Sequence, residues 1–183
     1  MHIAEQKKYT EADYNLLEEG APFQLINGDL IMSPSPILFH QLIVGKLHTL
    51  ISNFIAQTHS NGLVVLSPMD VKFDEENIFQ PDLLFISETR RAEVVHERIA
   101  GAPDLVIEIL SPSTAYYDLM QKKDVYERFG VKEYLIIDPI RQIAELHVLE
   151  NEVFTLKQKE AKNGFINLTT LPGLQIDLQK LFA

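Results

Sequence analysis

The sequence predicts a mixed α+β (α/β) protein in which residues 1–183 form one domain, with a central mixed sheet flanked by helices. Three observations predict this class. The chain has 183 residues, 46% hydrophobic and 23% charged, as is typical of one globular domain. Helical and strand-like apolar patterns both occur, but they do not alternate regularly enough for a doubly wound sheet. No repeat, low-complexity tract or linker divides the chain.

The first third of the chain predicts a short helix, a hairpin and a long helix. Thr10 and Asp13 have the spacing of a capping box, which favours a helix start. Asn27 and Gly28 join two short apolar runs and predict a β-hairpin, because both turn positions need a positive φ. A long helix is expected over about 37–59, where apolar residues recur at spacings of three and four.

The remaining sequence predicts a sheet interrupted by one helix. Segment 104–110, DLVIEIL, is almost continuously apolar, as expected of a strand buried on both faces. A helix over 115–129 follows and should end at Gly130. The C-terminal part predicts an antiparallel hairpin around Glu150 and Asn151, then a last strand and a short helix. Further strand-like runs lie at 63–66, 70–73, 79–86 and 133–138.

Charge and cysteine content limit the classes of function. The formal net charge of −10 disfavours broad contact with DNA phosphates, although a local basic cleft or a bound cation can override it. The chain has no cysteine, which excludes disulfides and thiolate metal sites. The sequence has no recognisable signal peptide and no apolar run of about 20 residues, so we expect a soluble cytoplasmic protein.

Two acidic residues stand inside apolar strand patterns. Asp82 follows a proline and begins the run DLLFI, and Glu108 lies within DLVIEIL. A buried carboxylate is costly unless it is paired, hydrogen-bonded or bound to a metal. We therefore expect both acids to share one site, whose hard oxygen ligands favour Mg²⁺ or Mn²⁺. Taken singly, Asp82 could cap a turn and Glu108 could pair with an arginine.

The helix after the second of these strands adds a lysine. Asp118, Lys122 and Tyr126 are spaced four apart, so they share one helix face. A strand–turn–helix connection brings Lys122 back toward Glu108. An amine beside a metal-bound water can orient the nucleophile and stabilise charge on a phosphate. Taken alone, Lys122 is better explained as a solvated helix residue.

Two smaller groups of residues have both a functional and a structural interpretation. Arg90, Arg91 and Arg98 could contact phosphates, but a solvated loop is the better interpretation at this net charge. Tyr116 and Tyr117 begin the lysine helix and could stack on a base, although packing is the commoner use.

These segments resemble a known group of proteins. An acid after proline, a glutamate in the next buried strand and a lysine resemble the PD-(D/E)XK nuclease superfamily. GAPDLVIEILSPST, the D-x-x-x-K-x-x-x-Y pattern at 118–126, GVKEYLIIDP and LINGDLIMSPSPILFH are similar to the Uma-two family, described as "putative restriction endonucleases". The similarity runs from about Thr10 to the final helix. It implies a restriction-endonuclease-like fold.

The resemblance also implies roles for individual residues. Asp82 matches the first metal-binding acid and Glu108 the second. The superfamily's lysine would fall at Leu110, so the resemblance implies that the lysine has moved to Lys122, with Lys123 as the second choice.

Two residues nearer the N-terminus complete the predicted set. His40 matches a family histidine and is expected near the site rather than as a ligand. Relatives often carry a glutamate where this chain has Gln24, which can offer a carbonyl oxygen but no charge. The metal is predicted on Asp82 and Glu108, and the predicted catalytic residues are Asp82, Glu108, Lys122, His40 and Gln24.

Three functions remain open at this point. The first is a Mg²⁺- or Mn²⁺-dependent DNA endonuclease that hydrolyses phosphodiester bonds. The second is a catalytically weak or inactive nuclease-fold protein that acts as a binding or structural module. The third is a metal-dependent hydrolase with another substrate. Restriction-type nucleases usually act as dimers, because a two-fold axis suits the cutting of two antiparallel strands, so we expect a homodimer.

Overall fold

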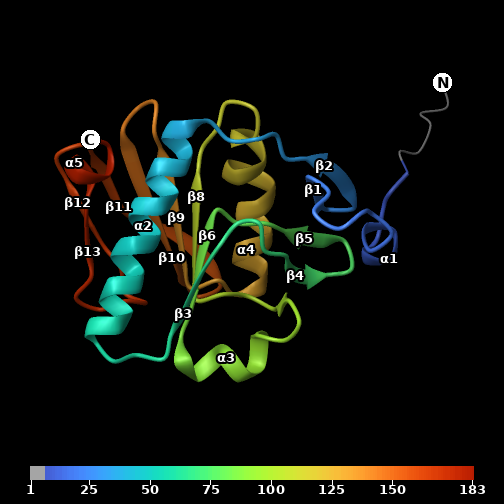
Figure 1. Ribbon diagram of the computed structural model, residues 1–183, viewed down its shortest axis with the longest axis horizontal. Helices are drawn as coiled ribbons and strands as arrows, with labels where there is room; N and C mark the ends of the chain where they lie inside the picture. The colour runs from blue at the N-terminus through green and yellow to red at the C-terminus, as the bar shows by residue number, and fades with distance from the viewer. Residues whose placement is uncertain (1–6) are drawn as a thin grey trace.

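A computed structural model describes residues 7–183 and shows a large mixed sheet with helices on both faces (Figure 1). The strand order is β11-β10-β9-β8-β6-β3. Only the β8–β9 pair is parallel within this sheet. The strands are β3 (Leu63–Leu66), β6 (Leu83–Ile86), β8 (Leu105–Ile109), β9 (Glu133–Asp138), β10 (Ile143–Glu150) and β11 (Val153–Ala161).

Two smaller sheets accompany the large one. The five-stranded sheet has the order β2-β1-β5-β4-β7, and β12 pairs with β13. The predicted hairpin is confirmed, with φ values of 49° at Asn27 and 76° at Gly28. The strands are β1 (Phe23–Ile26), β2 (Asp29–Met32), β4 (Val71–Asp74), β5 (Asn77–Phe79), β7 (Ile99–Ala100), β12 (Phe165–Asn167) and β13 (Gln175–Asp177).

The helices cover the large sheet from both sides. The long helix α2 crosses one face and α4 lies against the other (Figure 1). None of the helices within residues 7–183 combines the length and the apolar character that crossing a membrane requires. The helices are α1 (Glu11–Tyr14), α2 (Leu38–Gln57), α3 (Glu88–Val94), the π-helix η1 (Tyr117–Lys122), α4 (Lys123–Phe129) and α5 (Leu178–Leu181).

Strand β8 shows how the two faces are built. Its odd-numbered residues, such as Ile107 and Ile109, pack in the cluster that includes α2, whereas Val106 packs in the cluster that includes α4. Side chains alternate between the faces of a strand. Glu108 therefore lies on the same face as Val106, toward η1 and α4.

Three local predictions were wrong. The run 79–86 was expected to be one strand, but β5 ends at Phe79 and β6 begins at Leu83 in a different sheet. Pro81 explains this break, because proline has no N–H to donate to a strand ladder. The arginine-bearing loop contains helix α3, and the C-terminal segment holds two strands rather than one.

A buried glutamate ties the C-terminal segment to the large sheet. Glu133 is fully buried at the start of β9. Its carboxylate accepts hydrogen bonds from the backbone N–H groups of Thr169 at 2.7 Å and Thr170 at 2.8 Å, and from both threonine hydroxyls. A carboxylate is suited to this place because it is an acceptor at every lone pair.

Glu133→Gln is expected to lower the free energy of unfolding by about 2–3 kcal/mol, because hydrogen bonds to a charged group are lost and a buried donor is left unpaired. Urea denaturation followed by circular dichroism measures this change. The control is Glu145→Gln on β10, whose glutamate forms a partly exposed ion pair with Lys159. Its loss should cost less than about 1 kcal/mol. Equal losses in both variants would contradict the role given to Glu133.

Candidate functional site

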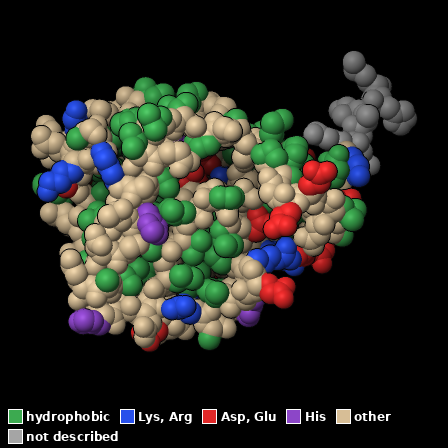
Figure 2. Space-filling model, viewed as in Figure 1, with side chains coloured by type: hydrophobic (Ala, Val, Ile, Leu, Met, Phe, Trp, Pro, Cys, Tyr) green, Lys and Arg blue, Asp and Glu red, His purple; other side chains and the backbone are tan. Residues whose placement is uncertain are grey.

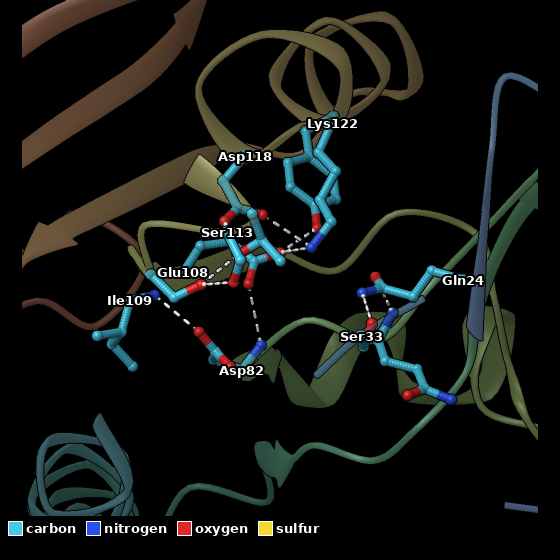
Figure 3. Close-up of polar contacts among 12 residues, drawn as sticks. Gln24, Ser33, Asp82, Glu108, Ile109, Ser113, Asp118 and Lys122 are labelled. Carbon is cyan, nitrogen blue, oxygen red and sulfur yellow. Dashed lines mark hydrogen bonds and ion pairs between the residues drawn. The ribbon is translucent and has the colours of Figure 1, made fainter. Parts of the chain in front are cut away.

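The structure brings Asp82 and Glu108 together at neighbouring strands of the large sheet (Figure 3). Leu83 pairs with Ile107, so Asp82 stands next to Glu108 across the β6–β8 ladder. The Asp82 N–H donates to Glu108 Oε2 at 3.2 Å, and the Ile109 N–H donates to Asp82 Oδ2 at 2.8 Å. Each acid is thus held by the backbone of the other's strand segment.

Helices η1 and α4 place two polar side chains, Lys122 and Tyr126, on Glu108, and a third, Asp118, on Lys122. Lys122 Nζ lies 3.0 Å from Glu108 Oε1 and 2.9 Å from Asp118 Oδ1. The Tyr126 hydroxyl donates to the same Glu108 oxygen at 2.8 Å. The predicted shared face of Asp118, Lys122 and Tyr126 is therefore present. Short π-helical segments such as η1 are rare and often occur at functional sites.

Burial governs the protonation of this cluster. Burial raises the pKa of Glu108 to about 7, against the opposing effect of the Lys122 ammonium. Burial alone would lower the pKa of Lys122, but the carboxylates of Asp118 and Glu108 outweigh it and raise that pKa. Glu108 and Asp118 share the single Lys122 ammonium, so when both are ionised these two carboxylates carry more negative charge than the lysine balances, and a cation can offset the excess.

The two predicted metal ligands fit a hard divalent cation. Within residues 7–183, Asp82 Oδ1 accepts no hydrogen bond, and Glu108 Oε2 accepts only the Asp82 N–H. No group of three or more acid or histidine side chains in this range could hold a metal ion. Two carboxylates are enough for Mg²⁺, which usually keeps several waters and takes one or two carboxylates.

His40 contacts the first acid. It lies in the first turn of α2, is 6% exposed, and places Nε2 3.1 Å from Asp82 Oδ2. Burial lowers the pKa of His40, but the hydrogen bond and charge of Asp82 outweigh burial and raise it. The histidine was expected near the site rather than as a ligand, and its contact with Asp82 fits that expectation.

The side chain of Gln24 is hydrogen-bonded to residues near Asp82 rather than to the carboxylates themselves. Its Nε2 donates to Ser33 Oγ at 2.7 Å, and its Oε1 accepts from the Gln80 N–H at 2.8 Å (Figure 3). The side chain therefore fixes the chain two residues before Asp82. Both polar ends of the amide already have partners within the protein.

Two residues of the cluster were absent from the predicted site. Asp118 and Tyr126 were noted only for sharing a helix face with Lys122, and that spacing of four was the available signal. Of the two candidate lysines, Lys122 is the one beside Glu108. The charge of Lys123 instead acts on His147, whose pKa is lowered first by burial and then by that lysine.

The arginines of the α3 region are already engaged within the protein. Arg98 pairs with Glu11, the Arg91 guanidinium donates to the Asn61 carbonyl at 2.8 Å, and Arg90 lies 3.6 Å from a glutamate one turn later. Figure 2 shows Lys and Arg side chains scattered over the viewed face rather than gathered in one patch. These observations favour the structural interpretation of the arginines.

The raised pKa of Glu108 predicts a pH-dependent stability. Between pH 4.5, the ordinary pKa, and pH of about 7, folded Glu108 holds a proton that the unfolded chain has released. The free energy of unfolding should therefore fall across this window, by about 3 kcal/mol relative to Glu108→Gln, and level off above it. Urea denaturation in EDTA at a series of pH values measures both proteins. A constant difference between them would rule out the raised pKa.

Comparison with known proteins places the chain in a family. A solved structure described as a putative nuclease belonging to DUF820, from Anabaena variabilis, superposes with a TM-score of 0.77. The match covers 94% of this chain and 97% of that one at 20% identity, and it shows a shared fold. The uncharacterised protein sll1609 of Synechocystis sp. is 29% identical over 142 residues, covering 75% of this chain and 79% of that protein.

The family model Uma2, described as "Putative restriction endonuclease", matches residues 10–179. This range includes both acids, the lysine helix, His40 and Gln24. The chain belongs to the Uma2 family.

Proposed function

We propose that this protein is a divalent-metal-dependent endonuclease that hydrolyses phosphodiester bonds in DNA. The observation that carries the proposal is the meeting of Asp82, Glu108 and Lys122 in one cluster, in a chain of this family. A buried cluster of ionisable groups whose pKa values are shifted by their neighbours is a common feature of catalytic sites.

Asp82 and Glu108 are the proposed ligands of Mg²⁺ or Mn²⁺. Such a cation lowers the pKa of a bound water and neutralises charge on the scissile phosphate. Asp82 offers Oδ1, because its Oδ2 is engaged by His40 and by the Ile109 N–H. Glu108 offers Oε2, because its Oε1 accepts from Lys122 and Tyr126.

Lys122 has two proposed tasks. Its ammonium orients the Glu108 carboxylate at 3.0 Å, and its raised pKa keeps the proton on Nζ throughout the neutral range. A fixed positive charge in a buried site is also suited to stabilising negative charge on a phosphate. Asp118 holds the same ammonium from its other side at 2.9 Å.

His40 and Gln24 are proposed as positioning residues. His40 Nε2 holds one oxygen of Asp82, which leaves the other oxygen available to the metal. Gln24 holds the Gln80 N–H and so fixes the chain just before Asp82. Hydrolysis adds water across a P–O bond, and the products are one phosphate end and one hydroxyl end.

The test uses the purified protein on single-stranded circular DNA and on plasmid DNA, with Mg²⁺, Mn²⁺ or EDTA. We expect cleavage of at least one substrate with either metal and none in EDTA. Gel electrophoresis resolves the products, and light scattering tests the proposed homodimer, which would suit cutting both strands of a duplex. DNA that stays intact with both metals contradicts the proposed endonuclease.

A nuclease-fold binding module is the second candidate. The observation in its favour is that Lys122 already balances Glu108 and that Gln24 adds no carboxylate to the site. This candidate predicts salt-sensitive DNA binding without cleavage. It is contradicted if the bound DNA is cut.

A further inference from the structure

We propose that a cleft beside helix η1 binds one unstacked, unpaired base of the DNA strand. The inference rests on the proposed function, because it names the form of DNA that the same site accepts. The cleft has a volume of about 380 Å³ and lies between the N-terminal segment, the β1–β2 hairpin and η1. This volume lies within the range of small-ligand pockets.

Aromatic side chains give the cleft a surface for stacking. Tyr116, Tyr117 and Tyr9 all line it. Tyr116 is 63% exposed and meets Tyr117 edge-on, with ring centroids 5.7 Å apart and an interplanar angle of 74°. The large exposed fraction of Tyr116 leaves part of its ring surface open to a stacking partner. Bases stack on exposed tyrosine faces in proteins that bind single strands.

A buried carbonyl gives the cleft a polar preference. Gln121 lines the cleft, and its Oε1 is buried without a hydrogen-bond partner among residues 7–183. A buried acceptor without a donor is unfavourable, so a ligand that brings an N–H there gains affinity. Every base carries at least one N–H donor on its Watson–Crick edge, and this donor is free only when the base is unpaired. The cleft therefore favours an unpaired base over a base that is already paired in a duplex.

The charges in the cleft favour a base over a phosphate. Lys7 and Asp29 are the charged residues that line it, and their formal charges cancel. Lys7 also lies 4.6 Å from the centroid of the Tyr9 ring and 3.8 Å from Asp13. A phosphate needs an excess of positive charge, which these lining residues do not supply. A neutral heterocycle needs only a stacking surface and a few hydrogen bonds.

Helix η1 separates the cleft from the acid cluster, which consists of Asp82, Glu108, Asp118 and Lys122. Gln121 and Lys122 are consecutive in η1, and Tyr117 and Asp118 are consecutive one turn earlier. In each pair, the first residue lines the cleft and the second joins the acid cluster. A strand held by a base in the cleft would therefore run close to the proposed metal ligands. Bases in a duplex are paired and stacked, so an unpaired base enters at a lower cost.

Fluorescence anisotropy with labelled oligonucleotides tests this inference in EDTA, where the bound DNA stays intact. The probes are short single strands of deoxyadenosine, deoxycytidine or thymidine, and a mixed-sequence duplex. We expect all three single strands to bind about tenfold more tightly than the duplex. Equal binding of duplex and single strands would overturn the proposal.

Variants of η1 and of Tyr116, the residue just before it, test which side chains contribute to DNA binding. Tyr116→Ala should weaken binding of the adenine strand about tenfold, whereas Tyr116→Phe should retain it. Gln121→Leu removes the acceptor for the base N–H and should weaken binding of the single strands about fivefold. The control is Met120→Ala, an exposed side chain of the same helix that does not line the cleft. If Tyr116→Ala and Met120→Ala bind alike, the cleft does not hold a base.

The two proposals fail in different ways. If the wild-type protein binds adenine strands through Tyr116 but cuts no DNA with either metal, the endonuclease proposal fails and the base cleft stands. If the protein cuts DNA but binds duplex and single strands alike, whether or not Tyr116 is replaced, the cleft proposal fails alone. Absence of binding to every oligonucleotide overturns the cleft proposal as well.

Discussion

Asp82→Asn is expected to lower kcat/KM for metal-dependent DNA cleavage by about a thousandfold or more, because it replaces a charged ligand with a neutral amide of the same shape. The change should leave the fold intact, since 19% of the Asp82 side chain is exposed and the asparagine oxygen can still accept the Ile109 N–H. The expected loss is therefore catalytic rather than structural.

Initial rates of cleavage at several Mn²⁺ concentrations measure the effect. Asp74→Asn is the matched control, because Asp74 is the last residue of β4 and takes no part in the acid cluster. That variant should cut at the wild-type rate. Asp82→Asn with more than about a tenth of wild-type kcat/KM would contradict the metal-binding role of this acid.

Among the single substitutions considered, Lys122→Met should cause the largest decrease in the free energy of unfolding. The methionine fills a similar volume but leaves Glu108 and Asp118 buried without the ammonium that now lies within 3.0 Å of both. Removing one partner of a buried ion pair typically costs about 3–5 kcal/mol. The free energy of unfolding at pH 8, measured by urea denaturation, should fall by this amount.

A double variant separates the stability effect from catalysis. Adding Asp118→Asn to Lys122→Met removes one of the two stranded carboxylates, so part of the lost stability should return. Cleavage should not return, because the ammonium beside Glu108 is still missing. A double variant no more stable than the single variant would show that Asp118 and Lys122 are not coupled.

The close approach of Asp82 and Glu108 could be predicted from the short segments that contain them. Asp82 and Glu108 each interrupt an apolar strand pattern. A buried carboxylate is costly unless it is paired, hydrogen-bonded or bound to a metal, so two of them are expected to share one site. The position of Lys122 near Glu108 could be predicted because residues spaced by four share a helix face, and this helix folds back over the strand that precedes it. In each case a short stretch of chain contained the information.

The remaining features depend on contacts between distant segments. Nothing near Pro81 in the sequence shows that β5 and β6 join different sheets. His40 reaches Asp82 across 42 positions, and Gln24 reaches the Gln80 N–H across 56. These contacts depend on how whole helices and strands pack against one another. The spacing of apolar residues along the sequence does not specify that packing. The same limit explains why Gln24 was predicted at the metal site rather than on the backbone that positions it.

The most direct test of the central claim is anomalous X-ray diffraction from crystals of the protein soaked in Mn²⁺. We predict one strong peak in bonding contact with the carboxylates of both Asp82 and Glu108, which disappears in crystals of Asp82→Asn. Soaked crystals with no peak at these two residues, or with Mn²⁺ bound only elsewhere, would contradict the claim that the two acids form a metal site.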